Sequence, residues 1–169
     1  ASHRVNRRYL PGIELPASVL PDTDLRRVVG SHRELLVCVP SHAFRATLAA
    51  VRRDLKPGTR LAWATKGFEH STGRLPHEVA AAELGTGVPV AVLSGPTFAR
   101  EVAAGLPTAM TVAASEPAYA VALAARLSDR TFRAYTSEDM IGVEVGGAVK
   151  NVLAIGAGIS DGLGFGANT

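Results

Sequence analysis

Short apolar runs alternate with longer segments of helical pattern along most of the chain, and this alternation predicts an α/β fold. The apolar runs contain β-branched residues and are bounded by glycine, proline or serine, as is typical of strands. They predict strands at 33–39, 61–65, 88–93, 108–113 and 132–136. The segments between and after them predict helices at 42–55, 75–84, 98–104, 118–127 and 139–158. Residues 1–24, which contain three prolines, are expected to form an entry segment on the surface.

Several helix ends are marked in the sequence. Ser41 is expected to cap the helix at 42–55, and Lys56-Pro57-Gly58 is expected to end it. Pro96 is expected to mark the start of a short helix that continues through 98–104, and Gly105 is expected to mark its end.

The predicted strands are apolar along their whole length, which indicates a parallel sheet covered on both faces. Ligands bind beyond the carboxyl ends of such strands. Three of these ends carry unusual residues, and we expect them to lie along one edge: Pro40-Ser41-His42, Lys66-Gly67 and Ser94-Gly95-Pro96-Thr97. The last segment is expected to attract anions with the free N–H groups of a helix start.

The segment Val143–Gly162 has two different faces on a helical wheel. The face around Lys150 carries Gly146, Gly147, Ala154, Ala157, Gly158 and Asp161. The opposite face carries Val145, Ala148, Val149, Val152, Ile155 and Ile159 and is expected to pack on a core. Glycine in a helix interior costs about 1 kcal/mol relative to alanine, so these glycines indicate close approach of a ligand or of another helix.

Lysine is rare in this chain, since only Lys56, Lys66 and Lys150 stand among 18 basic residues. Arginine does not lose its proton near neutral pH, whereas a lysine ammonium can when its surroundings favour it. Lys150 beside two glycines and Lys66 at a strand end are therefore candidates for proton transfer or ligand binding.

Composition narrows the functional class. Hydrophobic residues make up 47% and charged residues 20% of the 169 positions, which excludes a disordered tail, a collagen or a coiled coil. No run of 18 apolar residues and no secretory signal is present, so we expect no membrane span. Cys38 is the single cysteine and cannot form an internal disulfide, which favours the cytoplasm. No metal-ligand spacing occurs.

The net charge is +3, and residues 1–60 carry 11 basic and 5 acidic side chains. Aromatic residues are only 5% and do not alternate with the basic ones, so we expect a solvated surface and no nucleic-acid partner.

Taken together, five segments in order resemble the NAD(P)-dependent glycerol-3-phosphate dehydrogenases of bacterial type. They are Asn6-Arg7-Arg8-Tyr9-Leu10-Pro11-Gly12, Val39-Pro40-Ser41-His42, Thr65-Lys66-Gly67-Phe68-Glu69, Ser94–Val102 (SGPTFAREV) and Glu144–Asn151 (EVGGAVKN), the last continuing to Thr169. The resemblance implies hydride transfer between NAD or NADP and C2 of glycerol 3-phosphate or dihydroxyacetone phosphate, a phosphorylated triose, in phospholipid precursor synthesis.

The resemblance also assigns roles to individual residues. It implies that Lys150 is the general acid/base on the C2 oxygen. It implies substrate contacts for Lys66, Gly95, Thr97, Lys150 and Asn151, and cofactor contacts for Lys66, Ala99 and Phe44.

The family's glycine-rich pyrophosphate turn and most of its helical second domain have no counterpart here. No G-x-G-x-x-G follows a strand within the first 35 residues. We therefore expect the rear part of an incomplete Rossmann-like dinucleotide-binding domain at 1–137. At 138–169 we expect the first long helix of an all-α C-terminal domain. The 169 residues alone are expected to be inactive.

Three points stay open at this stage. One alternative is a catalytically incomplete fragment that only binds or oligomerises. Another is a related dehydrogenase for a β-hydroxy or sugar acid. The sequence does not decide between NAD and NADP, and a homodimer is one option for the assembly.

Overall fold

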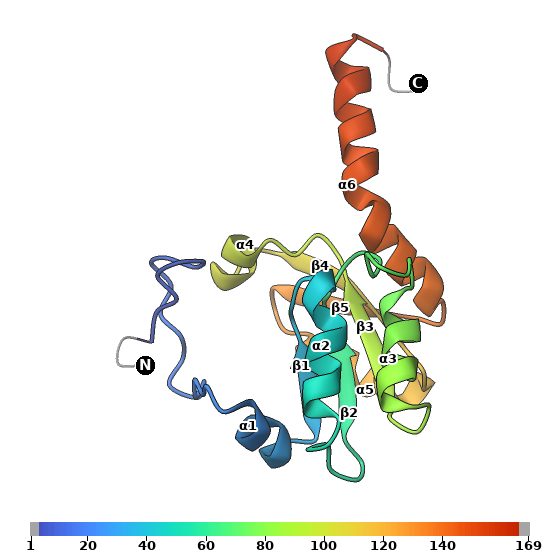
Figure 1. Ribbon diagram of the computed structural model, residues 1–169. Coiled ribbons are helices and arrows are strands. Elements are labelled where there is room, and N and C mark those ends of the chain that lie inside the picture. The colour runs from blue at the N-terminus through green and yellow to red at the C-terminus, as the bar shows by residue number, and fades with distance from the viewer. Residues whose placement is uncertain (1–3, 166–169) are drawn as a thin grey trace.

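The computed structural model describes residues 4–165 and contains a five-stranded sheet flanked by helices (Figure 1). In chain order the elements are α1 (Leu25–Ser31), β1 (Glu34–Val37), α2 (Ser41–Val51), β2 (Arg60–Trp63), α3 (Pro76–Leu84), β3 (Val90–Ser94), α4 (Ala99–Ala103), β4 (Thr108–Ala114), α5 (Pro117–Leu127), β5 (Phe132–Ser137) and α6 (Met140–Gly162). Every predicted strand and helix is present, with ends displaced by a few residues.

The helix α1 is absent from the prediction. Its first turn is capped by Asp24, whose carboxylate accepts a hydrogen bond from the Arg27 N–H at 3.1 Å. A capping aspartate followed by apolar Leu25, Val28 and Val29 is a helix signal that the sequence does carry.

The strand order is β1-β2-β3-β4-β5, and the direction of the strands differs from the prediction. β1, β2 and β3 are mutually parallel, but β4 runs antiparallel to β3, and β5 runs parallel to β4. The expectation of a wholly parallel sheet is therefore wrong. A parallel return needs a crossover connection that runs back along the length of the strands, usually a helix, and α4 has only five residues. The chain therefore reverses at the same edge where β3 ends.

Both faces of the sheet are covered, as predicted. One core cluster packs α2 and α3 against Leu61, Trp63 and Val92, and the other packs α5 against Ala62, Ala91 and Leu93. Neighbouring strand residues thus point to opposite cores, which explains why the strands are apolar throughout. Figure 1 shows α2 and α3 on one side of the sheet and α5 on the other.

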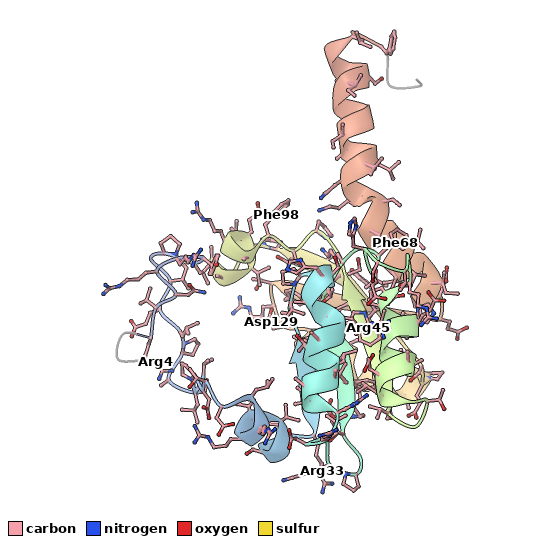
Figure 2. The ribbon with its side chains drawn as sticks, in the orientation of Figure 1. Arg4, Arg33, Arg45, Phe68, Phe98 and Asp129 are labelled. Atoms are coloured by element: carbon pink, nitrogen blue, oxygen red, sulfur yellow. The ribbon has the colours of Figure 1, made fainter. Side chains whose placement is uncertain are left out.

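The long helix α6 starts on the sheet and extends away from it (Figure 1). Its first turns contact β3 and β4, and Met140 and Val143 pack against the core. Within residues 4–165, the aliphatic face packs on a core in the first half of the helix and not in the second half. There, Val152, Ile155 and Ile159 are 58–68% exposed, on the part of α6 that extends beyond the rest of the fold (Figure 2).

By length and composition α6 is also the one helix among residues 4–165 that could cross a membrane, with a mean hydropathy of 1.4 over its most apolar window. Core helices of soluble proteins share this length and composition, so the two features alone do not identify a membrane span.

Candidate active site

The carboxyl ends of β1, β2 and β3 lie side by side, as predicted from their parallel direction. The Thr65 hydroxyl after β2 donates to the Val39 carbonyl after β1 at 2.7 Å. Lys66 Nζ donates to the Gly95 carbonyl after β3, also at 2.7 Å. These two bonds join the three loops at one edge of the sheet.

Beyond this edge lies a cavity of about 420 Å³ between the strand ends and α6, here called the lysine cleft. It is lined by Lys66, Ser94, Gly95, Pro96, Thr111, Val143, Gly146, Gly147 and Lys150. None of these lining residues is acidic, whereas two are lysines. The cleft therefore favours an anionic ligand.

Lys66 is half-buried at the base of the lysine cleft. Burial lowers the pKa of its ammonium, and the positive charge of Lys150 lowers it further. An ammonium has three N–H donors, so Lys66 can donate to Gly95 O and also to a bound ligand. A bound anion would offset the repulsion between the two lysines.

Lys150 reaches the cleft from α6. Its ammonium lies 5.5 Å from the centre of the Phe98 ring, within the range of a cation–π interaction. Among residues 4–165, Lys150 forms no salt bridge. Gly146 and Gly147 both line the same cavity as Lys150, and the predicted open space beside the glycines is present at Gly146 but not at Gly147.

Two glycines allow the walls of the cleft to approach each other. A Cβ placed at Gly147 would lie 2.7 Å from Ser94 Oγ, so α6 contacts the end of β3 without a side chain in between. A Cβ at Gly95 would lie 2.7 Å from the Ala109 carbonyl oxygen and 2.8 Å from Met110 Cα on β4. Both positions therefore require glycine for the packing of the cleft walls.

The loop at 94–97 is not a helix start, which corrects the sequence-based expectation. α4 begins at Ala99 after Phe98, so Pro96 lies outside the helix. The Thr97 N–H donates to the Gly95 carbonyl at 2.9 Å in a tight turn. Similarly, Ser41 is the first residue of α2, and no side chain caps that helix. Positive charge in the cleft thus comes from lysines and not from a helix terminus.

The remaining predicted residues are not among those that line the cleft, and they differ in position and exposure. Thr97 is half-buried in the loop beside Gly95, Ala99 is exposed at the start of α4, and Asn151 is exposed next to Lys150. Phe44 is 2% exposed and packs edge-on against Trp63 at 5.5 Å between ring centres. Its side chain is part of the core, so the structure does not bring it to the lysine cleft as the expected cofactor contact requires.

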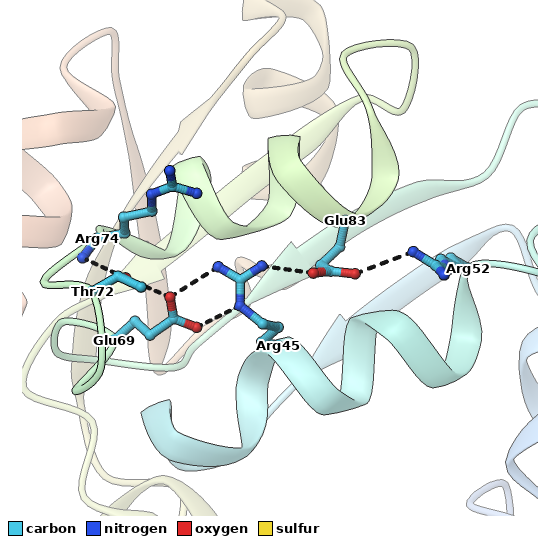
Figure 3. Close-up of polar contacts among 6 residues, drawn as sticks. All are labelled: Arg45, Arg52, Glu69, Thr72, Arg74 and Glu83. Carbon is cyan, nitrogen blue, oxygen red and sulfur yellow. Dashed lines mark hydrogen bonds and ion pairs between the residues drawn. The ribbon is translucent and has the colours of Figure 1, made fainter.

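A network of charged residues supports the loop that carries Lys66 (Figure 3). Arg45 of α2 donates to both carboxylate oxygens of Glu69, at 2.7 and 2.9 Å, and to Glu83 of α3 at 2.6 Å. Arg52 donates to the other oxygen of Glu83 at 3.3 Å. The hydrogen bonds from Arg45 lower the pKa of Glu69 to about 2. This network fixes the loop three residues beyond Lys66.

Sequence reasoning missed the buried carboxylate of Glu144, which lies on α6 six residues before Lys150. Its partners are Trp63 and His77. An acidic residue within an apolar helical segment is the signal that could have identified it.

Comparison with known proteins identifies the family. Residues 1–120 match the family described as NAD-dependent glycerol-3-phosphate dehydrogenase N-terminus, and residues 139–169 match its C-terminus. Glycerol-3-phosphate dehydrogenase [NAD(P)+] of Nitrosococcus oceani is 58% identical over 98% of this chain and 48% of its own length. The enzyme of the same name from Pseudoalteromonas translucida is 54% identical over 99% of this chain and 50% of its length.

A solved structure gives the same result. The crystal structure of glycerol-3-phosphate dehydrogenase from Coxiella burnetii has a TM-score of 0.88 and 45% identity, over 98% of this chain and 50% of that one. The chain thus spans about half the length of the relatives it matches. Because the N-terminal family match alone covers more than half of the 169 residues, the chain belongs to the NAD-dependent glycerol-3-phosphate dehydrogenase family.

Proposed function

We propose that these residues form part of an enzyme that interconverts glycerol 3-phosphate and dihydroxyacetone phosphate by hydride transfer with NAD or NADP. The observation that carries this proposal is the lysine cleft, in which Lys66 and Lys150 face one cavity whose lining contains no carboxylate. A phosphorylated triose brings the negative charge that such a cavity favours.

Lys150 is proposed as the general acid/base. In the oxidation direction, its neutral amine accepts the proton of the C2 hydroxyl while the hydride leaves C2. In the reduction direction, its ammonium returns that proton to the C2 oxygen. Arginine cannot perform this step, because the guanidinium does not give up its proton near neutral pH.

Substrate binding is proposed to involve Lys66, Gly95, Thr97 and Asn151 beside Lys150. The Lys66 ammonium is anchored on the Gly95 carbonyl, so its position is fixed before a ligand enters. The turn through Thr97 holds the same carbonyl in place, which keeps both groups at one wall of the cleft.

When bound, NAD or NADP would supply the nicotinamide ring as the acceptor or donor of the hydride. The volume of about 420 Å³ and the open space at Gly146 fit the reacting ring together with a three-carbon substrate. Lys66 and Ala99, by resemblance to the family, are proposed to hold that end of the cofactor.

The test is the change in absorbance at 340 nm when NADH or NADPH is mixed with dihydroxyacetone phosphate and the full-length protein. Lys150→Ala is expected to lower turnover about 10²–10⁴-fold, with unchanged circular dichroism. Lys56→Ala is the matched control, since Lys56 lies outside the lysine cleft. A normal rate in Lys150→Ala would remove this residue from the mechanism.

The same assay separates the alternatives. A related dehydrogenase would turn over a β-hydroxy or sugar acid and not the triose phosphate. A chain that only binds or oligomerises would turn over neither. The family match and the names of the relatives favour the triose phosphate.

We also propose a cytoplasmic location, a role in phospholipid precursor synthesis, a homodimer, and a domain boundary between residues 137 and 138. Limited proteolysis tests the boundary, and sedimentation of the full-length protein tests the dimer.

A further inference from the structure

Glu144 is a carboxylate outside the lysine cleft, and its side chain is only 1% exposed. A buried carboxylate is strongly disfavoured unless donors surround it. Here two N–H donors and one ring nitrogen of histidine surround it. Trp63 Nε1 and the backbone N–H of His77 donate to Glu144 Oε1 at 3.2 and 3.0 Å, and His77 Nδ1 lies 2.5 Å from Oε2. We call Glu144, Trp63 and His77 together the Glu144 clamp.

The Glu144 clamp joins three elements. Trp63 ends β2 and is fully buried, whereas His77 is the second residue of α3. The His77 N–H is one of the first-turn groups that have no partner within their own helix, and a negative charge at this end is favourable. One side chain of α6 therefore fixes that helix to the sheet and to the start of α3.

Glu144 and Lys150 lie on different faces of the same helix. Six residues separate them, which corresponds to about 9 Å along the axis and about 120° around it. Glu144 faces the core while Lys150 faces the lysine cleft. Because a helix is stiff over two turns, a rotation of α6 at Glu144 moves the Lys150 ammonium relative to Lys66.

Within residues 4–165, few other contacts hold this part of α6. Met140 and Val143 pack on the core, and Gly147 lies against Ser94. The residues at 151–159 are exposed among those the structure describes. Apolar contacts are not directional, whereas the hydrogen bonds of the Glu144 clamp set both the depth and the rotation of the helix.

We propose that Glu144 is a positioning residue for Lys150. Its carboxylate holds the first turns of α6 on Trp63 and His77, and this contact sets where the Lys150 ammonium lies in the cleft. The kinetic consequence rests on the proposed function. The geometric consequence does not, and it is tested separately.

The first readout is independent of activity. In the full-length protein, lysines are converted to ¹³C-dimethyl-lysine, and the NMR signal of Lys150 is assigned with Lys150→Arg. The indole N–H signal of Trp63 is assigned with Trp63→Phe. Glu144→Ala is expected to shift both signals. Glu144→Gln is expected to restore both, because its amide oxygen can accept the Trp63 and His77 N–H groups while its amide nitrogen donates to His77 Nδ1 in the tautomer that accepts there.

The second readout is kinetic. Glu144→Ala is expected to lower kcat at least about tenfold and to leave KM for the cofactor within about twofold, since the loops after β1, β2 and β3 are unchanged. Glu144→Gln is expected to recover most of kcat. The matched control is Asp139→Ala, which removes the cap on the Gly142 N–H of α6 but no contact with Trp63 or His77. It is expected to lower thermal stability and leave the Lys150 signal in place.

The outcomes separate the hypotheses. If the Trp63 signal moves in folded Glu144→Ala while the Lys150 signal and kcat stay as in the wild type, Glu144 has only a structural role and the proposal is wrong. If Glu144→Ala does not fold, His77→Ala decides, because it removes the ring contact and retains the Trp63 bond. An unmoved Lys150 signal in that variant overturns the proposal. If the wild type shows no turnover, the proposed function fails, and the Lys150 signal still decides the positioning role.

Discussion

Two adjacent glycines of α6 provide a sharp test of how closely the helix approaches the sheet. Gly146 and Gly147 both line the lysine cleft, and both lie within α6. A Cβ at Gly146 would meet nothing within 4 Å, whereas a Cβ at Gly147 would lie 2.7 Å from Ser94 Oγ. The substitutions Gly146→Ala and Gly147→Ala therefore differ in packing while sharing the same helix chemistry.

The size of the expected difference follows from two effects. Alanine stabilises a helix interior by about 0.5–1 kcal/mol relative to glycine, and both variants gain this amount. The Cβ at Gly147 must displace the half-buried Ser94 side chain or move α6, and overpacking of this kind costs about 1–3 kcal/mol. Gly146→Ala should thus be more stable than Gly147→Ala by about 1–3 kcal/mol.

Urea unfolding of the full-length variants measures this difference directly, with Ser94→Ala combined with Gly147→Ala as the control. Removing the hydroxyl should return most of the lost stability, because Ser94 Oγ is the nearest atom to the added Cβ. At saturating substrate, kcat should also be higher in Gly146→Ala than in Gly147→Ala, since a displaced α6 carries Lys150 away from Lys66. Equal stability of the two alanine variants would show that α6 does not lie against Ser94.

Two further substitutions test the charged groups around the cleft. Because burial and the charge of Lys150 lower the pKa of Lys66, the unfolded state binds that proton more tightly, and stability should rise as the pH rises toward the ordinary lysine value of 10.5. Lys66→Met should abolish this rise in urea midpoints between about pH 7 and 10 and should raise KM for both substrate and cofactor. Arg45→Ala should lower Tm at neutral pH more than the control Arg53→Ala does. Arg53 is an exposed arginine just beyond the end of the same helix. Since Arg45 holds the Glu69 pKa at about 2, below its usual 4.5, the Tm gap to the wild type should be constant above pH 4.5 and should close as the pH falls toward 2.

The positions of the strands and helices could be predicted because each depends on a local pattern. Leu61, Ala62 and Trp63 are all apolar since alternate residues enter two different cores. The direction of β4 could not be predicted in this way. It depends on the connection between β3 and β4, whereas the expectation of a parallel sheet came from the apolar strands alone. The short helix predicted at 98–104 is close to the five residues of α4, and neither is long enough to return the chain along the strands.

The two lysines of the site could be identified because they are rare and because each has a local context. Glu144 stands out in the sequence only as an acidic residue within an apolar helical segment, and the donors that surround its carboxylate lie far away along the chain. Its donors Trp63 and His77 are 81 and 67 residues away along the chain, so nothing near Glu144 shows that its carboxylate is buried among N–H groups. The burial of Phe44 also depends on distant residues, since Trp63 comes from β2.

The glycines of α6 show how far a helical wheel can explain a sequence. Gly146, Gly147 and Gly158 fall on the face of Lys150, and the helical wheel alone gives these three glycines one common cause. The structure separates them, because Gly147 meets Ser94, whereas a Cβ at Gly146, Gly156 or Gly158 would meet nothing within 4 Å. Packing within the described residues therefore accounts for Gly147. At Gly146 the space lies in the lysine cleft, where an added methyl group would compete with a ligand and not with the protein. Stability should accordingly respond to substitution at Gly147, and substrate binding should respond at Gly146.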